Sequence, residues 1–239
     1  MKEDNLIWFV YPYGSMNDMV GRLLSRMSIF VDRPIDLASP GCIMDIDLGT
    51  ALISDLDNFR SQDIPVLLER GVFDVGIVGW DWIVERNADI IEVANFALAR
   101  NSFSPIRLVL AAPEELGYKS IADLPKGATI ATEYPVIVRG YLRQNGRSDI
   151  KVQLTYGQTE RMVRVGAADA VVDIVETGGS LAANGLAIVE VIAESVMILA
   201  ANKEAWNDPD KRLAIQKLGK MLLDCYRLML LDERRGIEV

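Results

Sequence analysis

Two glycines flanked by hydroxyl side chains follow an apolar run that carries acids, in the stretch Asp169–Leu186 (DAVVDIVETGGSLAANGL). The apolar run contains Asp173 and ends at Glu176, and Thr177-Gly178-Gly179-Ser180 then leads directly into a predicted helix. Glycines let backbone N–H groups approach an anion, hydroxyls add donors, and a helix N-terminus presents N–H groups with a positive partial charge. The pattern predicts a phosphate-binding loop, with an ordinary strand–turn–helix connection as the alternative. Acids at such a strand end are typical of contacts to ribose hydroxyls or to metal-bound pyrophosphate.

A second group of polar residues lies in Arg60–Pro65 (RSQDIP) and in Gly71–Trp82 (GVFDVGIVGWDW). Arg60 is expected in a loop before a helix. Asp81 is expected just after the carboxyl end of a buried strand, where open α/β sheets bind ligands. The alternative is structural, because an acid at a helix start and glycines in a strand also serve capping and close packing.

A third group comprises Ala131–Tyr134 with Arg139, and Tyr156–Glu160 (YGQTE). Both segments follow predicted strands, so we expect them at the same rim of a sheet. Glu160 begins a predicted helix, where the helix dipole by itself favours a carboxylate. Its role is therefore either in ligand binding or in helix stabilisation.

The composition removes many other kinds of chemistry. The 239 residues include no histidine, which excludes Ser-His-Asp triads, Cys-His pairs, His-ligated zinc and histidine general bases. With 25 basic and 34 acidic residues the formal net charge is −9, which argues against general nucleic-acid or anionic-membrane binding. Cys42 and Cys225 are expected to be two free thiols. Because no apolar run approaches the roughly 20 residues that cross a bilayer and the first residues lack a signal-peptide pattern, we expect a soluble cytoplasmic protein.

The elements that must position these residues alternate between strands and short helices. Strands are predicted at Leu6–Tyr11, Cys42–Ile46, Thr50–Ser54, Phe73–Val78, Ile106–Ala112, Ala128–Thr132, Lys151–Thr155, Ala170–Val175, Val189–Glu194 and Val196–Ala201. Helices are predicted at Met16–Met27, Ile64–Arg70, Trp80–Asn87, Ile121–Leu124, Pro135–Asn145, Thr159–Val165, after the loop that begins at Thr177, and at Asp210–Leu231. This alternation indicates an α/β fold with mostly parallel sheets. We expect two lobes with the active site in the cleft between them, one of residues 1–97 and 194–239 and one of residues 98–193.

Taken together, the three groups resemble the ATP phosphoribosyltransferase family, which performs the first step of histidine biosynthesis. Its typical elements appear here as Asp63-Ile64-Pro65, Asp74–Asp81, Ile130–Pro135, Gly157–Glu160 and Asp169–Leu186. The resemblance implies that N1 of ATP attacks C1′ of phosphoribosyl pyrophosphate, with Mg²⁺ carried by the departing pyrophosphate and no metal held by the protein alone. It implies catalytic roles at the ribose for Glu160 and Asp173. The implied phosphoribosyl pyrophosphate site is Asp169, Glu176, Thr177, Gly178, Gly179, Ser180 and Leu181, and the implied nucleotide site is Arg60, Asp81, Tyr13 and Ser15.

The sequence departs from the family's pattern in two places. Members commonly carry Lys and Arg after the first strand, where this chain reads Pro12-Tyr13-Gly14-Ser15, and Ala182 stands where many members have a charged residue. Only 36 residues (239 − 203) follow Lys203, which resembles the short form of the family. That form works with a regulatory subunit resembling histidyl-tRNA synthetase, so a homo- or hetero-oligomer is expected.

Three functions remain open from the sequence. The first is ATP phosphoribosyl transfer. The second is a paralogue that keeps the phosphoribosyl site but uses another acceptor or different chemistry, which the loss of two cations opposite a triphosphate would fit. The third is a non-catalytic small-molecule-binding or regulatory protein, because the two-lobed fold also serves periplasmic-type binding proteins.

Overall fold

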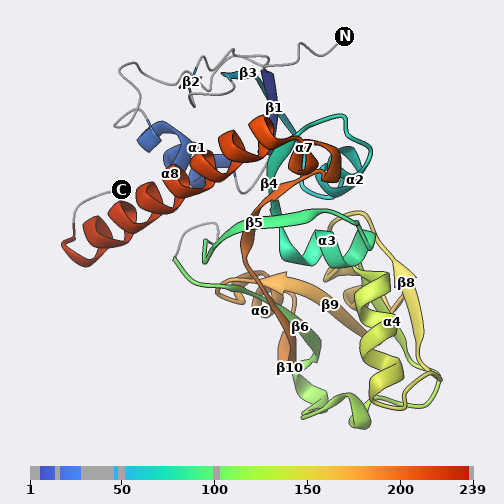
Figure 1. Cartoon of the computed structure of the whole chain (residues 1–239). Coiled ribbons are helices and arrows are strands. Elements are labelled where there is room, and N and C mark those ends of the chain that lie inside the picture. The colour runs from blue at the N-terminus through green and yellow to red at the C-terminus, as the bar shows by residue number, and fades with distance from the viewer. Residues whose placement is uncertain (1–5, 14–16, 28–45, 48–51, 99–102, 237–239) are drawn as a thin grey trace. The chain divides into compact units, whose positions relative to one another are not determined.

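The computed structural model describes residues 6–13, 17–27, 46–47, 52–98 and 103–236 (Figure 1). They form two compact units. One contains the residues up to Ser104 together with those from Val196 onward, and the other is Pro105–Ser195. The chain therefore leaves the first unit, completes the second, and returns to the first.

The first unit is built on a six-stranded sheet in the order β2-β3-β1-β4-β11-β5. Its strands are β1 Leu6–Tyr13, β2 Ile46–Asp47, β3 Leu52–Arg60, β4 Val75–Gly79, β5 Ile91–Phe96 and β11 Met197–Ala201. β1 pairs in parallel with β3 and β4, whereas β11 is antiparallel to both β4 and β5. The last strand in the chain thus lies between two strands formed much earlier.

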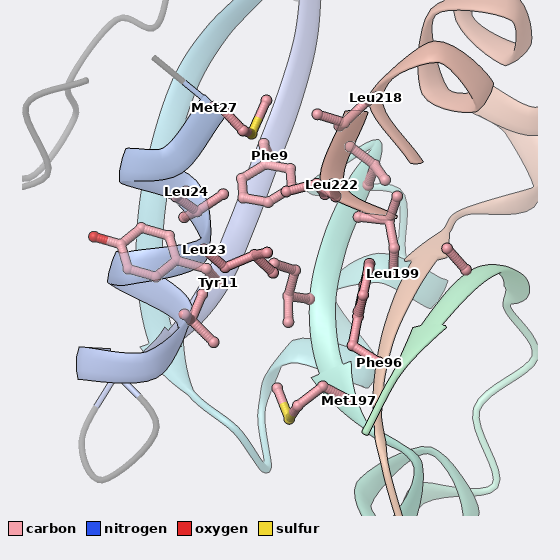
Figure 2. Close-up of a cluster of buried hydrophobic side chains, with 14 of the residues drawn as sticks. Phe9, Tyr11, Leu23, Leu24, Met27, Phe96, Met197, Leu199, Leu218 and Leu222 are labelled. Atoms are coloured by element: carbon pink, nitrogen blue, oxygen red, sulfur yellow. The ribbon is translucent and has the colours of Figure 1, made fainter. Parts of the chain in front are cut away.

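The helices of this unit are α1 Asn17–Arg26, α2 Ile64–Glu69, α3 Trp80–Arg86, α7 Lys203–Asn207 and α8 Pro209–Arg234. Apolar side chains from α1, α8 and the sheet form one buried cluster, and Phe9, Leu23 and Leu199 in it are fully buried (Figure 2). The long helix starts where the sequence predicts, because the Asp208 carboxylate accepts hydrogen bonds from the N–H groups of Asp210 and Lys211 at 2.9 and 3.0 Å.

The second unit is built on a five-stranded sheet in the order β10-β6-β9-β7-β8. Its strands are β6 Ile106–Pro113, β7 Thr129–Thr132, β8 Lys151–Leu154, β9 Ala170–Val175 and β10 Leu186–Ser195. The helices are α4 Pro135–Gln144, α5 Arg161–Arg164 and α6 Gly179–Ala183, with 3₁₀ turns at Glu114–Leu116 and Ile121–Asp123. β7 pairs in parallel with β8 and β9, and β6 is antiparallel to β9 and β10.

The α/β class is confirmed, but both sheets are mixed where mostly parallel sheets were expected. β10 pairs antiparallel with β6, and β11 pairs antiparallel with β4 and β5, so each sheet contains strands of both directions. β3 extends to Arg60, which therefore ends a strand and does not lie in a loop, and β5 was not predicted. Cys42 and Ser15 lie outside the described residues, and Cys225 is a buried free thiol on α8. Among the described residues, no helix has the length and apolar character needed to cross a membrane.

Candidate phosphoribosyl site

The predicted phosphate loop lies at the edge of the second sheet where three parallel strands end. β7 ends at Thr132, β8 at Leu154 and β9 at Val175, and all three run in the same direction. The loops that follow them carry Glu133, Glu160 and the Thr177–Ser180 turn. The sequence prediction of a shared rim agrees with this topology for the segments that directly follow the strands. Arg139, which was grouped with them, lies midway along α4 and lines a cavity with Lys151 at the start of β8.

The loop itself has the backbone that its glycines allow. Gly178 has a φ of 80° and a ψ of 2°, a left-handed conformation that residues with a Cβ rarely adopt. Leu181 is 2% exposed and packs in the core of the second unit, so it anchors the loop and its side chain is not available to a ligand. Thr177, Gly179 and Ser180 are exposed. α6 has only five residues, so the loop's own N–H groups and hydroxyls must supply more of any anion binding than a helix dipole does.

Carboxylates gather beside this loop. The Ser180 hydroxyl donates a hydrogen bond to Glu160 Oε1, which links the loop to the segment after β8. The pKa of Asp173 is raised from 3.8 to about 7, mainly by burial and further by the negative charges of Glu160 and Glu133. The N–H of Ile174 donates to Asp173 Oδ1 at 2.7 Å, which partly offsets the increase. Asp173, Glu160 and Glu133 are therefore close enough to interact electrostatically, and they form one acidic group.

Buried threonines fix the backbone of the two neighbouring loops. Thr132 Oγ1 accepts a hydrogen bond from the Tyr134 N–H at 2.9 Å. The hydroxyls of Thr155 and Thr159 are hydrogen-bonded to each other at 2.8 Å, which closes the turn that ends at Glu160. The sequence analysis missed both this role and Glu133. One sequence pattern could have indicated the role of the threonines, because a threonine stands at or just after the end of two strands, at Thr132 and Thr155.

Asp169 is not brought to this site. It precedes the first residue of β9, and its carboxylate accepts a hydrogen bond from the Thr129 N–H at 2.7 Å. The six residues of β9 place it about 20 Å from the loop, at 3.3 Å per residue. This hydrogen bond links the starts of β7 and β9. Glu176 is half-buried and directly follows β9, so it does lie at the loop.

Three of the predicted nucleotide residues, Tyr13, Arg60 and Asp81, are described, and they lie in the first unit at or just after the carboxyl ends of parallel strands. Tyr13 and Arg60 are register partners at the ends of β1 and β3, and both are exposed, Tyr13 to 60%. Asp81 follows the neighbouring strand β4, but it is 2% exposed in the first turn of α3. Its Oδ1 lies 2.3 Å from the point where a Cβ on Gly79 would stand, so a side chain at position 79 would displace the Asp81 carboxylate. Asp81 therefore lies at a helix start with a buried side chain, and its contact with a nucleotide stays a prediction.

No set of three or more His, Cys, Asp or Glu side chains in the described part of the chain is arranged to hold a metal ion. The acidic group of Asp173, Glu160 and Glu133 is not such a set.

A family model described as "HisG: ATP phosphoribosyltransferase" matches residues 60–223, which is 164 of 239 residues. The chain belongs to the ATP phosphoribosyltransferase family. The match begins at Arg60 and contains the predicted phosphate loop, the acidic group and the threonine turns. It excludes β1, where the sequence departs from the family's pattern.

Curated members of the family align over most of this chain. The "ATP phosphoribosyltransferase" of Pelotomaculum thermopropionicum is 44% identical over 168 residues, covering 70% of this chain and 57% of that protein. The protein of the same name from Chlorobium phaeobacteroides is 38% identical over 218 residues, covering 91% of this chain and 71% of its own length. The aligned region thus spans a little over half of the first relative.

Solved structures share the fold. A chain of the "ATP phosphoribosyl transferase (HisG:HisZ) complex from Thermotoga maritima" superimposes with a TM-score of 0.71 at 23% identity, covering 92% of this chain and 97% of that one. The periplasmic aliphatic sulphonate binding protein SsuA of Escherichia coli superimposes with a TM-score of 0.62 at 17% identity, covering 99% of this chain and 80% of its own. The expected two-lobed fold of the periplasmic-binding-protein kind is therefore confirmed.

Proposed function

We propose that this chain transfers the phosphoribosyl group of phosphoribosyl pyrophosphate to N1 of ATP and releases pyrophosphate, the first step of histidine biosynthesis. One observation carries the proposal. This member of the family has a glycine-rich turn in which Gly178 is left-handed and the Ser180 hydroxyl donates a hydrogen bond to Glu160. The negative charge of Glu160 also helps to raise the pKa of Asp173, so the turn and the two acids form one local group.

In this mechanism the Thr177–Ser180 turn binds the 5′-phosphate through its N–H groups and hydroxyls. Asp173 accepts hydrogen bonds from the ribose hydroxyls, and Glu160, held by Ser180, lies near the same sugar. Positive charge develops at C1′ as pyrophosphate leaves, and neighbouring carboxylates stabilise that charge without any proton transfer. This chemistry suits a chain without histidine.

We further propose Mg²⁺ as a component of the substrate complex, bound to pyrophosphate oxygens. It would offset the negative charge of the leaving group, which the acidic group around Asp173 would otherwise repel. The family resemblance favours a metal that arrives with its substrate.

A second candidate is a family member with another acceptor. Tyr13 ends β1 beside Arg60 and is 60% exposed, where members of the family commonly carry a cation. Arg60 then supplies the only positive charge of this register pair, against four negative charges on a triphosphate. An acceptor with fewer phosphates would fit this edge better.

The deciding assay mixes the chain with a regulatory subunit resembling histidyl-tRNA synthetase, measures pyrophosphate release with phosphoribosyl pyrophosphate, Mg²⁺ and ATP, and identifies the product by mass spectrometry. The proposal expects release with ATP that is lost in Gly178→Asp. Release with another nucleotide but not ATP would support the second candidate. If calorimetry detects no binding of phosphoribosyl pyrophosphate by the folded chain, both candidates are wrong.

We also propose that activity requires assembly with a second kind of subunit resembling histidyl-tRNA synthetase. The matched Thermotoga maritima chain comes from a HisG:HisZ complex, which supports this idea through the shared fold. Size-exclusion chromatography of the chain alone and of the chain mixed with such a subunit tests it, with pyrophosphate release as the second readout. Full activity of the chain alone would contradict this requirement.

A further inference from the structure

A cavity of about 480 Å³ lies between α4 and β8 in the second unit, two elements that run side by side in Figure 1. Its size is in the range of small-molecule sites. Its lining consists of apolar and basic side chains with one serine: Leu142, Ile150, Val152, Arg139, Arg143, Lys151 and Ser148. We propose that this cavity binds a small organic phosphate with a flat ring, of about the size of a nucleoside monophosphate.

The positive charges around the cavity are not neutralised by any carboxylate among the described residues. Arg139 and Arg143 are exposed one turn apart on α4, and Lys151 is exposed at the start of β8. Within the described residues, none of these three side chains has an ion pair with a carboxylate. The acid nearest in sequence, Asp149, is already bound by Arg147 at 3.0 Å and by the Gly127 N–H at 3.0 Å. The rim of the cavity therefore stays positive in a chain of net charge −9.

Helix stability alone does not account for this arrangement. A basic residue in the last turn of a helix is favoured by the dipole, which explains Arg143. It does not explain Arg139, because like charges four residues apart on a helix repel each other. Nor does it explain Lys151, which belongs to a different element. An anion seated between the three would relieve the repulsion among them.

The floor of the cavity suits a ring. Leu142 and Ile150 are buried and Val152 is half-buried, so they offer an apolar surface beneath the charged rim. A phosphate at the rim with a ring on this floor would use both parts of the lining. Inorganic phosphate would use only the rim.

The cavity is separate from the phosphoribosyl site. Lys151 begins β8, whereas the Thr155–Thr159 turn that positions Glu160 follows the other end of that strand. α4 runs from the end of β7 back to the start of β8, so its last turn, with Arg143, also lies at the far end. The two sites therefore lie at opposite ends of the parallel strands of one sheet.

Pyridoxal 5′-phosphate tests the site, because its aldehyde forms an imine with a lysine amine, releasing water, and borohydride then fixes the adduct for peptide mass spectrometry. We expect Lys151 to be labelled about tenfold faster than Lys126, an exposed lysine of the same unit, because the clustered cations concentrate the anion. Adenosine monophosphate should protect Lys151 and leave Lys126 unchanged. Inorganic phosphate should protect it less.

Two double variants complete the test. Arg139→Gln with Arg143→Gln should bring Lys151 down to the labelling rate of Lys126. The matched control, Arg161→Gln with Arg164→Gln, removes two exposed arginines from the same unit and should leave the preference intact. Circular dichroism checks that both variants fold. Equal labelling of the two lysines, equal effects of the two double variants, or protection of Lys151 by poly-glutamate but not by adenosine monophosphate would each overturn the proposal.

Discussion

Replacing Asp173 with Asn should make the protein more stable near neutral pH, because the native carboxyl is destabilised by its surroundings. Burial is the largest cause of its raised pKa, followed by the charges of Glu160 and Glu133. Asn has nearly the same shape, keeps an oxygen that can accept from the Ile174 N–H at the position of Oδ1, and carries no charge. The substitution therefore removes the unfavourable charge with little change in packing.

The direction of the pH dependence follows from which state binds the proton. Between pH 3.8 and about 7 the folded state holds a proton on Asp173 that the unfolded chain has lost, so the stability of the unmodified protein falls as the pH rises through this window. From pH 5.5 to pH 7 this amounts to about 2 kcal/mol, at 1.36 kcal/mol for each pH unit. Above pH 7 the difference is constant. The advantage of Asp173→Asn should therefore grow by about 2 kcal/mol between pH 5.5 and pH 8.

Urea unfolding at pH 5.5 and pH 8 measures the effect, and the isoelectric point of about 4.7 sets the lower limit of the useful range. The four tryptophans all lie in the first unit, so circular dichroism and tyrosine fluorescence must report on the second. Asp169→Asn is the matched control on the same segment. It weakens a bond to the Thr129 N–H and should be destabilising at both pH values. An Asp173→Asn advantage that is the same at both pH values, or a carboxyl titration midpoint near 4 by NMR, would refute the reasoning.

Further outcomes can be measured on the same protein. Asp173→Asn should weaken binding of phosphoribosyl pyrophosphate by on the order of 1.5–3 kcal/mol in calorimetry without weakening free pyrophosphate, and equal losses for both would assign the residue to metal binding or folding. Gly178→Asp should abolish binding of phosphoribosyl pyrophosphate, since it adds a negative charge at the loop; unchanged affinity would remove the loop from the site. Restoring cations with Tyr13→Lys and Ser15→Arg should raise ATP affinity if the acceptor has changed. Strong ATP turnover by the unmodified chain that the two substitutions do not alter would contradict the assignment of these two positions to the nucleotide site. Gly76→Ala should lower the free energy of unfolding by about 1–3 kcal/mol, measured by tryptophan-monitored urea unfolding. The added Cβ would stand 2.4 Å from Val10 Cγ1 and 2.7 Å from the Val10 carbonyl oxygen. A smaller loss of stability would mean that β1 and β4 can separate easily.

The turn at Gly178 between β9 and α6 was predictable because its signal is local. Gly178 takes a left-handed φ that few other residues accept, and a short sequence of Gly with hydroxyl residues after an apolar strand reports that requirement directly. The N-terminus of the long helix at Asp208 was predictable for the same reason, since an Asp followed by Pro specifies a cap.

Features that depend on distant pairing were harder to predict. β3 contains Asp55, Asp57 and Asn58, which are depleted in strands, yet it pairs with β1 along its full length and so continues to Arg60. The mixed direction of the sheets follows from where β10 and β11 return, which no local pattern encodes. Asp169 and Asp173 looked alike in sequence, and the length of β9 separates their surroundings.

The position of β11 constrains the order in which the chain can fold as it leaves the ribosome. Its neighbours β4 and β5 are complete by Phe96, but the strand between them begins at Met197, after the whole of the second unit. The second unit needs no later residue, because its first and last strands already pair at Ile106 and Ser195. Synthesis from the N-terminus therefore gives the inserted unit time to fold first. Until β11 is made, the edges of β4 and β5 that will pair with it are unpaired, and a chaperone or another nascent chain could bind them.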